Sequence, residues 1–143
     1  MTDYWIAVVS KEHAMQGVEG GFIQINHGKE APLKRIKKND WIIIYSPKLS
    51  METDVTCQAF TAIGQATDDR VYQVQMTDTF APFRRGIQFH DCQEIPIKSL
   101  IERLGFIHNK KSWGAVFRFG FFAIQENDFN LIKSEMLPNE NKG

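Results

Sequence analysis

Residues 58–76 read QAFTAIGQATDDRVYQVQM, and this stretch decides the fold class that we expect. Two β-prone runs, Gln58–Ala66 and Val71–Met76, stand on either side of the polar residues Thr67-Asp68-Asp69-Arg70. Two such runs separated by a short polar segment are typical of antiparallel strands joined as a hairpin. The stretch therefore predicts a β-hairpin, and with it a sheet that is mostly antiparallel.

Four further segments have the composition or the alternation of strands. Tyr4–Val9 is a short apolar run, as expected of a buried first strand, and Trp41–Tyr45 is a strongly β-prone run that Pro47 ends. Phe22–Asn26 and Arg85–Asp91 alternate along their length, which is the pattern of strands with two different faces. These segments, the hairpin and a last strand before residue 125 are the candidates for a sheet that we expect to contain about six short strands.

The helical segments are few and mostly short. We expect a short helix that Ser10 caps and Gly17 ends, one turn at Pro32–Ile36, a helix at Pro96–Leu104, and a final helix that Asn127 or Asp128 caps and that runs to Met136 with Phe129, Ile132 and Met136 facing inward. The predicted fold class is α+β, with a small mixed or antiparallel pseudo-barrel of five to six strands flanked by helices. The 143 residues fit one domain, placed at 1–137, with a flexible tail at 138–143.

The composition is that of a soluble globular protein, with 43% apolar and 24% charged residues. No apolar run reaches the roughly 18 residues that span a bilayer, and the N-terminus lacks the features of a signal peptide. Cys57 and Cys92 belong to no metal-binding or redox motif, so we expect reduced thiols. These features predict a cytoplasmic protein without a membrane partner, as a monomer or weak dimer.

The residues that most catalytic sites need are not arranged in any recognised pattern. The sequence contains no GxxxxGK[ST] phosphate loop, and its four histidines are scattered. His90 and Cys92 would share a strand face, but no third residue is spaced to complete a zinc site. We therefore expect no metal, no cofactor and no catalytic residues.

Basic residues are clustered although the formal net charge is zero. Five of them lie between Lys29 and Lys38, against the single acidic residue Glu30. A solvated face is the ordinary explanation of such a strip, and contact with nucleic-acid phosphates is the functional one. The residues that we expect to contact phosphates are Lys29, Lys34, Arg35, Arg84, Arg85 and Lys110.

Polar and aromatic side chains mark the points where strands end. The segment Gly20–Lys29 (GGFIQINHGK) changes from a strand into a polar, glycine-containing junction, and Tyr45-Ser46 and Trp113-Gly114 mark similar transitions. If the sheet curls, these ends would surround one mouth, where an aromatic ring that stacks on a base contributes roughly 1–3 kcal/mol. Each of these residues taken alone is equally well explained as a surface turn or as part of the core.

Several blocks of the sequence, in order, resemble EVE-domain proteins of the PUA-like superfamily, which also contains the YTH and ASCH domains. The blocks are YWIAVVSKEH, GGFIQINHGKEAPLKRIKKND, WIIIYSP, AFTAIGQ, YQVQM, FAPFRR and SWGAVFRFGFFAI. They extend from Tyr4 to about Met136, which is nearly the whole chain.

The resemblance implies a pseudo-barrel with a base-binding pocket at one end. Relatives with this fold bind nucleic acid, and EVE domains are thought to read modified bases, notably modified cytosines in DNA. By position, the pocket residues would be Ser10, Gln24, Asn26, His27, Gly28, Tyr45, Ser46 and Trp113, with Phe121 as a weaker candidate. The YTH cage is built mainly from tryptophans, and only Trp113 matches it here, which disfavours a methyladenine reader.

Three functions are therefore open on the sequence alone. The first is a non-catalytic module that binds a base of DNA or RNA, in particular a modified base. The second is an ASCH-like hydrolase of a modified nucleoside, for which His27 is the one evident general base. The third is a protein-interaction scaffold, which an exposed apolar patch without a pocket would favour.

Overall fold

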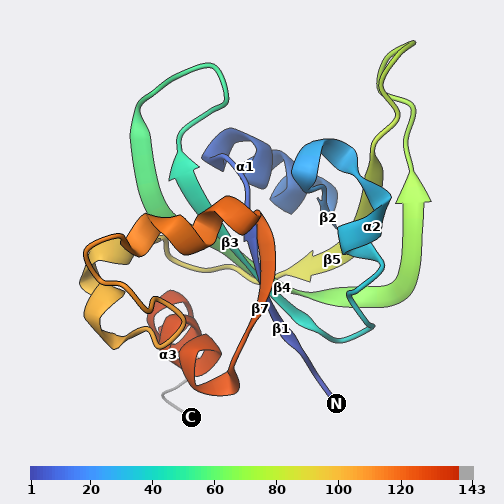
Figure 1. The fold of residues 1–143 in the computed structure, drawn as a ribbon. Helices are drawn as coiled ribbons and strands as arrows, with labels where there is room; N and C mark the ends of the chain where they lie inside the picture. The colour runs from blue at the N-terminus through green and yellow to red at the C-terminus, as the bar shows by residue number, and fades with distance from the viewer. Residues whose placement is uncertain (139–143) are drawn as a thin grey trace.

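A computed structural model describes residues 1–138 of the chain (Figure 1). Its sheet is mixed, with helices packed against it, so the predicted α+β class is confirmed. Of the predicted flexible tail, only Pro138 lies within the described residues, and 139–143 lie outside them. No helix in the described part combines the length and the apolar character that a membrane span requires.

The sheet has seven strands in the order β2-β5-β4-β3-β1-β7, and β6 pairs with β4 off this path. Only β1 and β3 are parallel; every other pair is antiparallel. The sheet therefore has seven strands where five or six were expected, and the two-residue strand β6 has no counterpart among the predicted strands. The strands are β1 (Tyr4–Val8), β2 (Phe22–Ile23), β3 (Trp41–Lys48), β4 (Thr56–Gln73), β5 (Phe83–Phe89), β6 (Ile95–Pro96) and β7 (Phe121–Ile124).

Three α-helices and four 3-10 segments complete the described structure. They are α1 (Lys11–Gly20), η1 (Asn26–Gly28), α2 (Glu30–Leu33), η2 (Ile97–Ser99), η3 (Ile101–Arg103), η4 (Trp113–Phe119) and α3 (Glu126–Met136). The parallel pair β1 and β3 is joined through α1, β2, η1 and α2, as parallel strands require a long crossover connection.

The predicted hairpin at residues 58–76 is wrong, because residues 58–73 all belong to the single long strand β4, which bends across the molecule (Figure 1). Residues 74–76 lie in the loop that follows it. Both halves pair with β5: Gly64–Ala66 pair with residues 87–89, and Val71–Gln73 pair with residues 83–85. The four polar residues between them form an irregularity in the register, not a turn. The Asp69 carboxylate accepts a hydrogen bond from the Lys38 backbone nitrogen over 2.7 Å. This polar side chain therefore binds the segment that precedes β3 and does not mark a turn.

Several predicted boundaries also differ from the structure. The first helix continues past Gly17 to Gly20, where Gly21 ends it with a left-handed φ of 73°. Strand β3 continues through Pro47 to Lys48. The predicted strand at residues 22–26 keeps only its first two residues, since Asn26 already has a positive φ of 49°.

The two C-terminal helices were predicted with unequal success. Residues 96–104 form two 3-10 turns, η2 and η3, instead of one helix. The last helix is present, and its predicted inward residues Phe129, Ile132 and Met136 are buried. Asp128 does not cap it, because its carboxylate accepts hydrogen bonds from the backbone nitrogens of Gly105 and Phe106, over 2.8 and 2.9 Å.

Each face of the sheet carries its own hydrophobic core. Ile42 and Ile44 of β3 belong to the core that also contains Ala14 of α1 and Leu33 of α2. Ile43 and Tyr45 belong to the opposite core, which contains residues of η2, η3, η4 and α3. Because side chains alternate along a strand, the apolar run of β3 serves both cores.

Candidate functional site

A pocket of about 450 Å³ lies where β1 and β3 end, between α1 and the segment 22–28. Met51 of the loop before β4 and Met76 and Phe80 of the loop before β5 complete its wall. These two loops project from the sheet on either side of α1 (Figure 1). The polar lining residues are Ser10, His13, Gln16, Gln24, Asn26, His27, Lys48 and Arg84.

The charge of this lining has one sign. Lys48 and Arg84 are cationic, His13 and His27 add positive charge when protonated, and none of the lining residues is acidic. A concave wall with cations alone attracts anionic or electron-rich ligands, because the low-dielectric protein concentrates the field there.

Arg84 is fixed within the pocket by three contacts. Its Nε donates to Oε1 of Gln24 over 3.1 Å, and one of its terminal nitrogens lies 3.4 Å from the sulfur of Met76. Its guanidinium carbon lies 3.8 Å from the centre of the Phe22 ring, a cation–π contact. Because the Gln24 carbonyl oxygen is engaged by Arg84, the amide NH₂ of Gln24 is the group left to donate to a ligand.

The backbone at Asn26, His27 and Gly28 is left-handed at three successive residues, with φ values of 49°, 60° and 81°. Each non-glycine residue in this region costs roughly 1–2 kcal/mol, so the surrounding contacts must hold the segment in place. Gly28 donates to the Ile25 carbonyl over 2.9 Å, and a Cβ atom at this position would overlap the Pro82 ring. The turn places the exposed side chains of Asn26 and His27 at the pocket wall.

Ser10 is buried at the start of α1 and caps that helix. Its hydroxyl accepts from the His13 backbone nitrogen over 3.4 Å, and its carbonyl accepts from Ala14 over 2.8 Å. Ser10 therefore fixes the first turn of α1 beside the pocket, and with it the backbone of His13, whose side chain is exposed.

Comparison with protein-family models matches residues 3–135 to the model described as EVE domain. The chain belongs to the EVE domain family. It is 51% identical to the UPF0310 protein in gntR 5'region of Bacillus licheniformis over 128 residues, which cover 90% of this chain and 87% of the relative. It is 47% identical to a UPF0310 protein of Mycolicibacterium vanbaalenii over 133 residues, which cover 93% and 92%.

Solved structures share the fold of this EVE domain at low sequence identity. The NMR structure of Rpa0253 from Rhodopseudomonas palustris matches with a TM-score of 0.57 and 10% identity, covering 92% of this chain and 90% of that one. The crystal structure of Atu2648 from Agrobacterium tumefaciens matches with a TM-score of 0.54 and 13% identity, with the same coverage. At these identities the likeness concerns the fold alone.

The pocket of this EVE domain gathers part of the residue set that the sequence predicted. Ser10, Gln24, Asn26, His27 and Gly28 all line it. Sequence reasoning missed His13, Phe22, Lys48 and Phe80. The sequence could have indicated Phe22 as a pocket residue, since it lies two positions before Gln24 on the same face of the predicted strand.

Tyr45 and Ser46 do not face this pocket, so their predicted place in its wall is wrong. Tyr45 is 2% exposed and stacks on Phe117 in the opposite core, with ring centres 3.9 Å apart. Burial raises the pKa of the Tyr45 hydroxyl well above its usual range. Ser46 is fully buried, and its hydroxyl lies 2.8 Å from that of Thr61.

Trp113 and Phe121 do not supply the expected aromatic floor either. Trp113 begins η4 and packs, half-buried, against the core that contains Tyr45. Phe121 is stacked on Trp5 with ring centres 4.7 Å apart, and its accessible edge borders a second depression. The aromatic rings of the pocket are instead those of Phe22 and Phe80.

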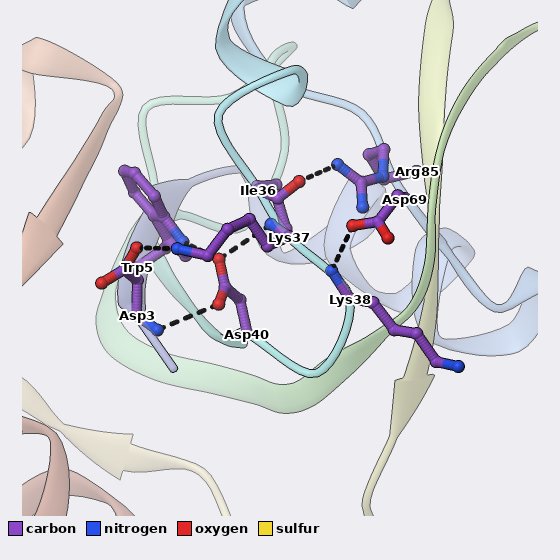
Figure 2. Close-up of polar contacts among 8 residues, drawn as sticks. All are labelled: Asp3, Trp5, Ile36, Lys37, Lys38, Asp40, Asp69 and Arg85. Carbon is purple, nitrogen blue, oxygen red and sulfur yellow. Dashed lines mark hydrogen bonds and ion pairs between the residues drawn. The ribbon is translucent and has the colours of Figure 1, made fainter. Parts of the chain in front are cut away.

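Two predicted phosphate contacts are structural residues. Arg85 is 0% exposed and donates to the backbone carbonyls of Leu33, over 2.7 Å, and of Asp68. It also donates to the carbonyl of Ile36, as Figure 2 shows. The Lys110 ammonium donates to the carbonyls of Ile101 and Leu104, over 3.0 and 2.8 Å. Both cations satisfy buried carbonyl groups, so the prediction that they contact phosphates is wrong.

The remaining predicted cations lie at the surface or in the pocket. Lys29, Lys34 and Arg35 are exposed, and Lys34 lies 3.5 Å from the Glu30 carboxylate. Arg84 lines the pocket. For these four residues, phosphate contact stays a prediction.

The basic strip is attached to the sheet through Asp40, which no sequence pattern had indicated. Its buried carboxylate accepts from the backbone nitrogens of Asp3 and Lys37, over 2.9 and 2.8 Å, and from the indole nitrogen of Trp5 over 3.0 Å. Lys37 also pairs with the Asp3 carboxylate, as Figure 2 shows. The charge of Lys37 therefore serves the fold, and this shortens the strip that is available to a partner.

Proposed function

We propose that this EVE domain is a non-catalytic module that holds one base of a nucleic acid, in particular a modified base, in the pocket between α1 and residues 22–28. The observation that carries the proposal is the polar wall of this pocket, which contains cations and amides and no acidic residue among the described lining residues. DNA and RNA are both candidates.

The size and surface of the pocket suit a planar heterocycle. Its volume of about 450 Å³ lies within the range of roughly 300–1,000 Å³ that is usual for small-molecule sites. Phe80 is 37% exposed at the edge of the pocket, so its ring is accessible to a base. Phe22 contributes apolar surface, although Arg84 already lies against its ring.

The hydrogen-bonding groups favour a base edge that accepts protons. The free NH₂ of Gln24 and the remaining guanidinium hydrogens of Arg84 are donors, and Asn26 adds an amide at the wall. Carbonyl oxygens and unprotonated ring nitrogens of a base accept such bonds. These hydrogen bonds would discriminate among bases, whereas stacking on an aromatic ring accepts any base.

Cations around the pocket would hold the phosphates. Lys48 lines the pocket, and Lys29 directly follows its left-handed turn. Phosphate contacts supply affinity without sequence information, and each lowers log K by roughly 0.7–0.9 per unit of log salt.

The residues of the pocket support binding more strongly than turnover. No carboxylate or thiol lines it in the described chain, so His13 and His27 have no acidic group in the pocket to orient them. The Ser10 hydroxyl is engaged as a helix cap. Cys57 and Cys92 lie elsewhere, and burial raises the pKa of both thiols, which disfavours the reactive thiolate.

The proposal is tested by titrating short single-stranded DNA and RNA oligonucleotides into the protein and following fluorescence anisotropy. Each carries one 5-methylcytosine, 5-hydroxymethylcytosine or N6-methyladenine, or the unmodified base. We expect one modified oligonucleotide to bind more tightly than its unmodified counterpart, and Gln24→Ala to abolish the difference. Since extruding a paired base costs a few kcal/mol, a duplex should bind more weakly than the single strand.

The exposed histidine His108 provides a matched control for His27, because it does not line the pocket. His27→Ala should weaken binding and His108→Ala should not. Equal affinity for all oligonucleotides, unchanged in Gln24→Ala and His27→Ala, would overturn the proposal. Release of a modified base or of its modifying group during incubation would favour the hydrolase instead.

A further inference from the structure

A second depression, of about 500 Å³, lies beside the first pocket and shares one of its walls. The shared wall is Asn26, which lines both hollows. The other lining residues are Pro32, Arg35, Phe119, Phe121 and Phe122. The Asn26 side chain packs against Gly120, and a Cβ atom on Gly120 would overlap the Asn26 amide oxygen. Asn26 therefore forms a ridge between the two hollows, and this ridge lies against the start of β7.

Phe119 offers an aromatic ring to the solvent at this depression. It lies at the end of η4 and is 73% exposed, compared with 37% for Phe80. Gly120 follows it with a φ of 75° and donates to the Phe117 carbonyl over 3.1 Å. The chain reverses there, so Phe117 enters the core while Phe119 stays outside.

Arg35 supplies a positive charge at the same place. Its guanidinium carbon lies 4.9 Å from the centre of the Trp5 ring and 5.6 Å from that of Phe121. The side chain is exposed, and no carboxylate of the described residues lies within ion-pair distance of it. The aromatic contacts hold the guanidinium in place while its hydrogen-bonding edge stays available.

We infer that this depression is a second nucleotide subsite, which receives the neighbour of the base in the first pocket. The inference rests on the proposed function. The neighbouring base stacks on Phe119, and Arg35 pairs with the phosphate that joins the two nucleotides. Asn26 stands between the two bases as the ridge over which the backbone passes.

Charge and position both favour a nucleotide over a protein side chain as the occupant. The only ionisable residue among the six lining residues is Arg35, so the depression complements an anion with a planar apolar group attached. A nucleotide has both features, and stacking of its base on an aromatic ring is tolerant of sequence. The shared wall with the first pocket explains why the two hollows would be occupied by one strand.

The inference predicts a specific dependence of affinity on oligonucleotide length. The probes are the mononucleotide, dinucleotide and trinucleotide of each modified base in the first titration, measured by calorimetry with the full chain. The dinucleotide or trinucleotide should bind the unaltered protein more tightly than the mononucleotide. Phe119→Ala should weaken the longer probes by roughly 5- to 150-fold, the range for stacking of one base, and leave the mononucleotide unchanged.

Two further variants separate the contribution of the Arg35–phosphate contact from that of stacking on Phe119. Arg35→Ala should weaken the longer probes and reduce the salt dependence of their binding by about one phosphate contact. Arg118→Ala is the matched control, because Arg118 is exposed beside Phe119 and lines neither hollow. Phe119 is largely exposed, so its variant should fold normally even if Arg35→Ala loses packing against Trp5.

The outcomes distinguish this inference from the proposed function. Mononucleotide binding without any gain from the longer probes, or equal weakening of all probes in Phe119→Ala, would overturn the second subsite alone. Loss of self-association in Phe119→Ala with unchanged oligonucleotide binding would assign the depression to a protein contact and also overturn it. Absence of binding to every probe would overturn the proposed function and the inference together.

Discussion

Arg84 donates a hydrogen bond from its Nε to Oε1 of Gln24 across 3.1 Å, and this pair orients the polar wall of the pocket. The pair joins β5 to the segment that follows β2, because Gln24 comes directly after that strand. Removing the guanidinium would free the Gln24 amide to rotate and would also remove a cation from a wall without acidic residues.

Arg84→Ala should therefore weaken oligonucleotide binding by roughly 2 kcal/mol, the usual cost of losing a charged hydrogen-bond donor. Anisotropy titration measures the loss. The exposed Arg70, which does not line the pocket, is the control, and Arg70→Ala should bind normally. Unchanged affinity in Arg84→Ala would show that the Arg84–Gln24 pair has no part in recognition.

Arg85 should behave differently from its neighbour in sequence. Its guanidinium satisfies buried carbonyl groups, so Arg85→Met should destabilise the fold by roughly 3 kcal/mol or more. Urea unfolding measures this cost, and Arg84→Met is the comparison, since Arg84 is half-buried. A stable Arg85→Met protein with a reduced salt dependence of binding would instead restore Arg85 as a phosphate contact.

The left-handed turn predicts a contrast between two glycines. Gly28 has a φ of 81° and no room for a Cβ atom beside Pro82, whereas nothing lies within 4 Å of a Cβ atom at Gly114. Gly28→Ala should cost roughly 1–3 kcal/mol and lower the Tm, and Gly114→Ala should change stability little. Equal melting temperatures for the two variants would contradict the strained geometry of the turn.

The buried hydroxyl of Tyr45 predicts a loss of stability in alkali. Burial raises the pKa of Tyr45 in the folded state, so above about pH 10 the unfolded chain loses this proton while the folded chain keeps it. The free energy of unfolding should then fall with pH by up to about 1.4 kcal/mol per pH unit. Below pH 10 this contribution is fully present.

Tyr45→Phe should reduce this alkaline slope, measured as urea unfolding between pH 9 and 11. Tyr72→Phe is the control, because Tyr72 is half-exposed on β4. Identical slopes in the unaltered protein and in Tyr45→Phe would contradict the buried position of the hydroxyl.

Local patterns predicted the strand segments well and their partners poorly. Residues 58–73 are β-structure as expected, but a polar interruption of four residues does not distinguish a hairpin turn from a bend within one strand. Here Asp69 binds the Lys38 backbone, and the carbonyl of Asp68 accepts from Arg85. Those partners are distant in sequence, so no local pattern reveals them.

The same limit explains which site residues were found. Gln24, Asn26 and His27 lie next to one another in sequence, so one segment carries them into the pocket together. Tyr45 was misplaced because its position on the strand does not tell which of the two cores it faces. Phe80 reaches the pocket on a loop whose path depends on the bend of β4.

The central claim is that a single base enters the pocket between α1 and residues 22–28. The most direct measurement is a set of amide NMR spectra recorded while a modified mononucleotide is added to the full chain. We predict chemical-shift changes concentrated at residues 8–17, 22–28 and 84, where the pocket is lined. Changes confined to the opposite core around Tyr45 and Phe117, or none at saturating nucleotide, would contradict the claim.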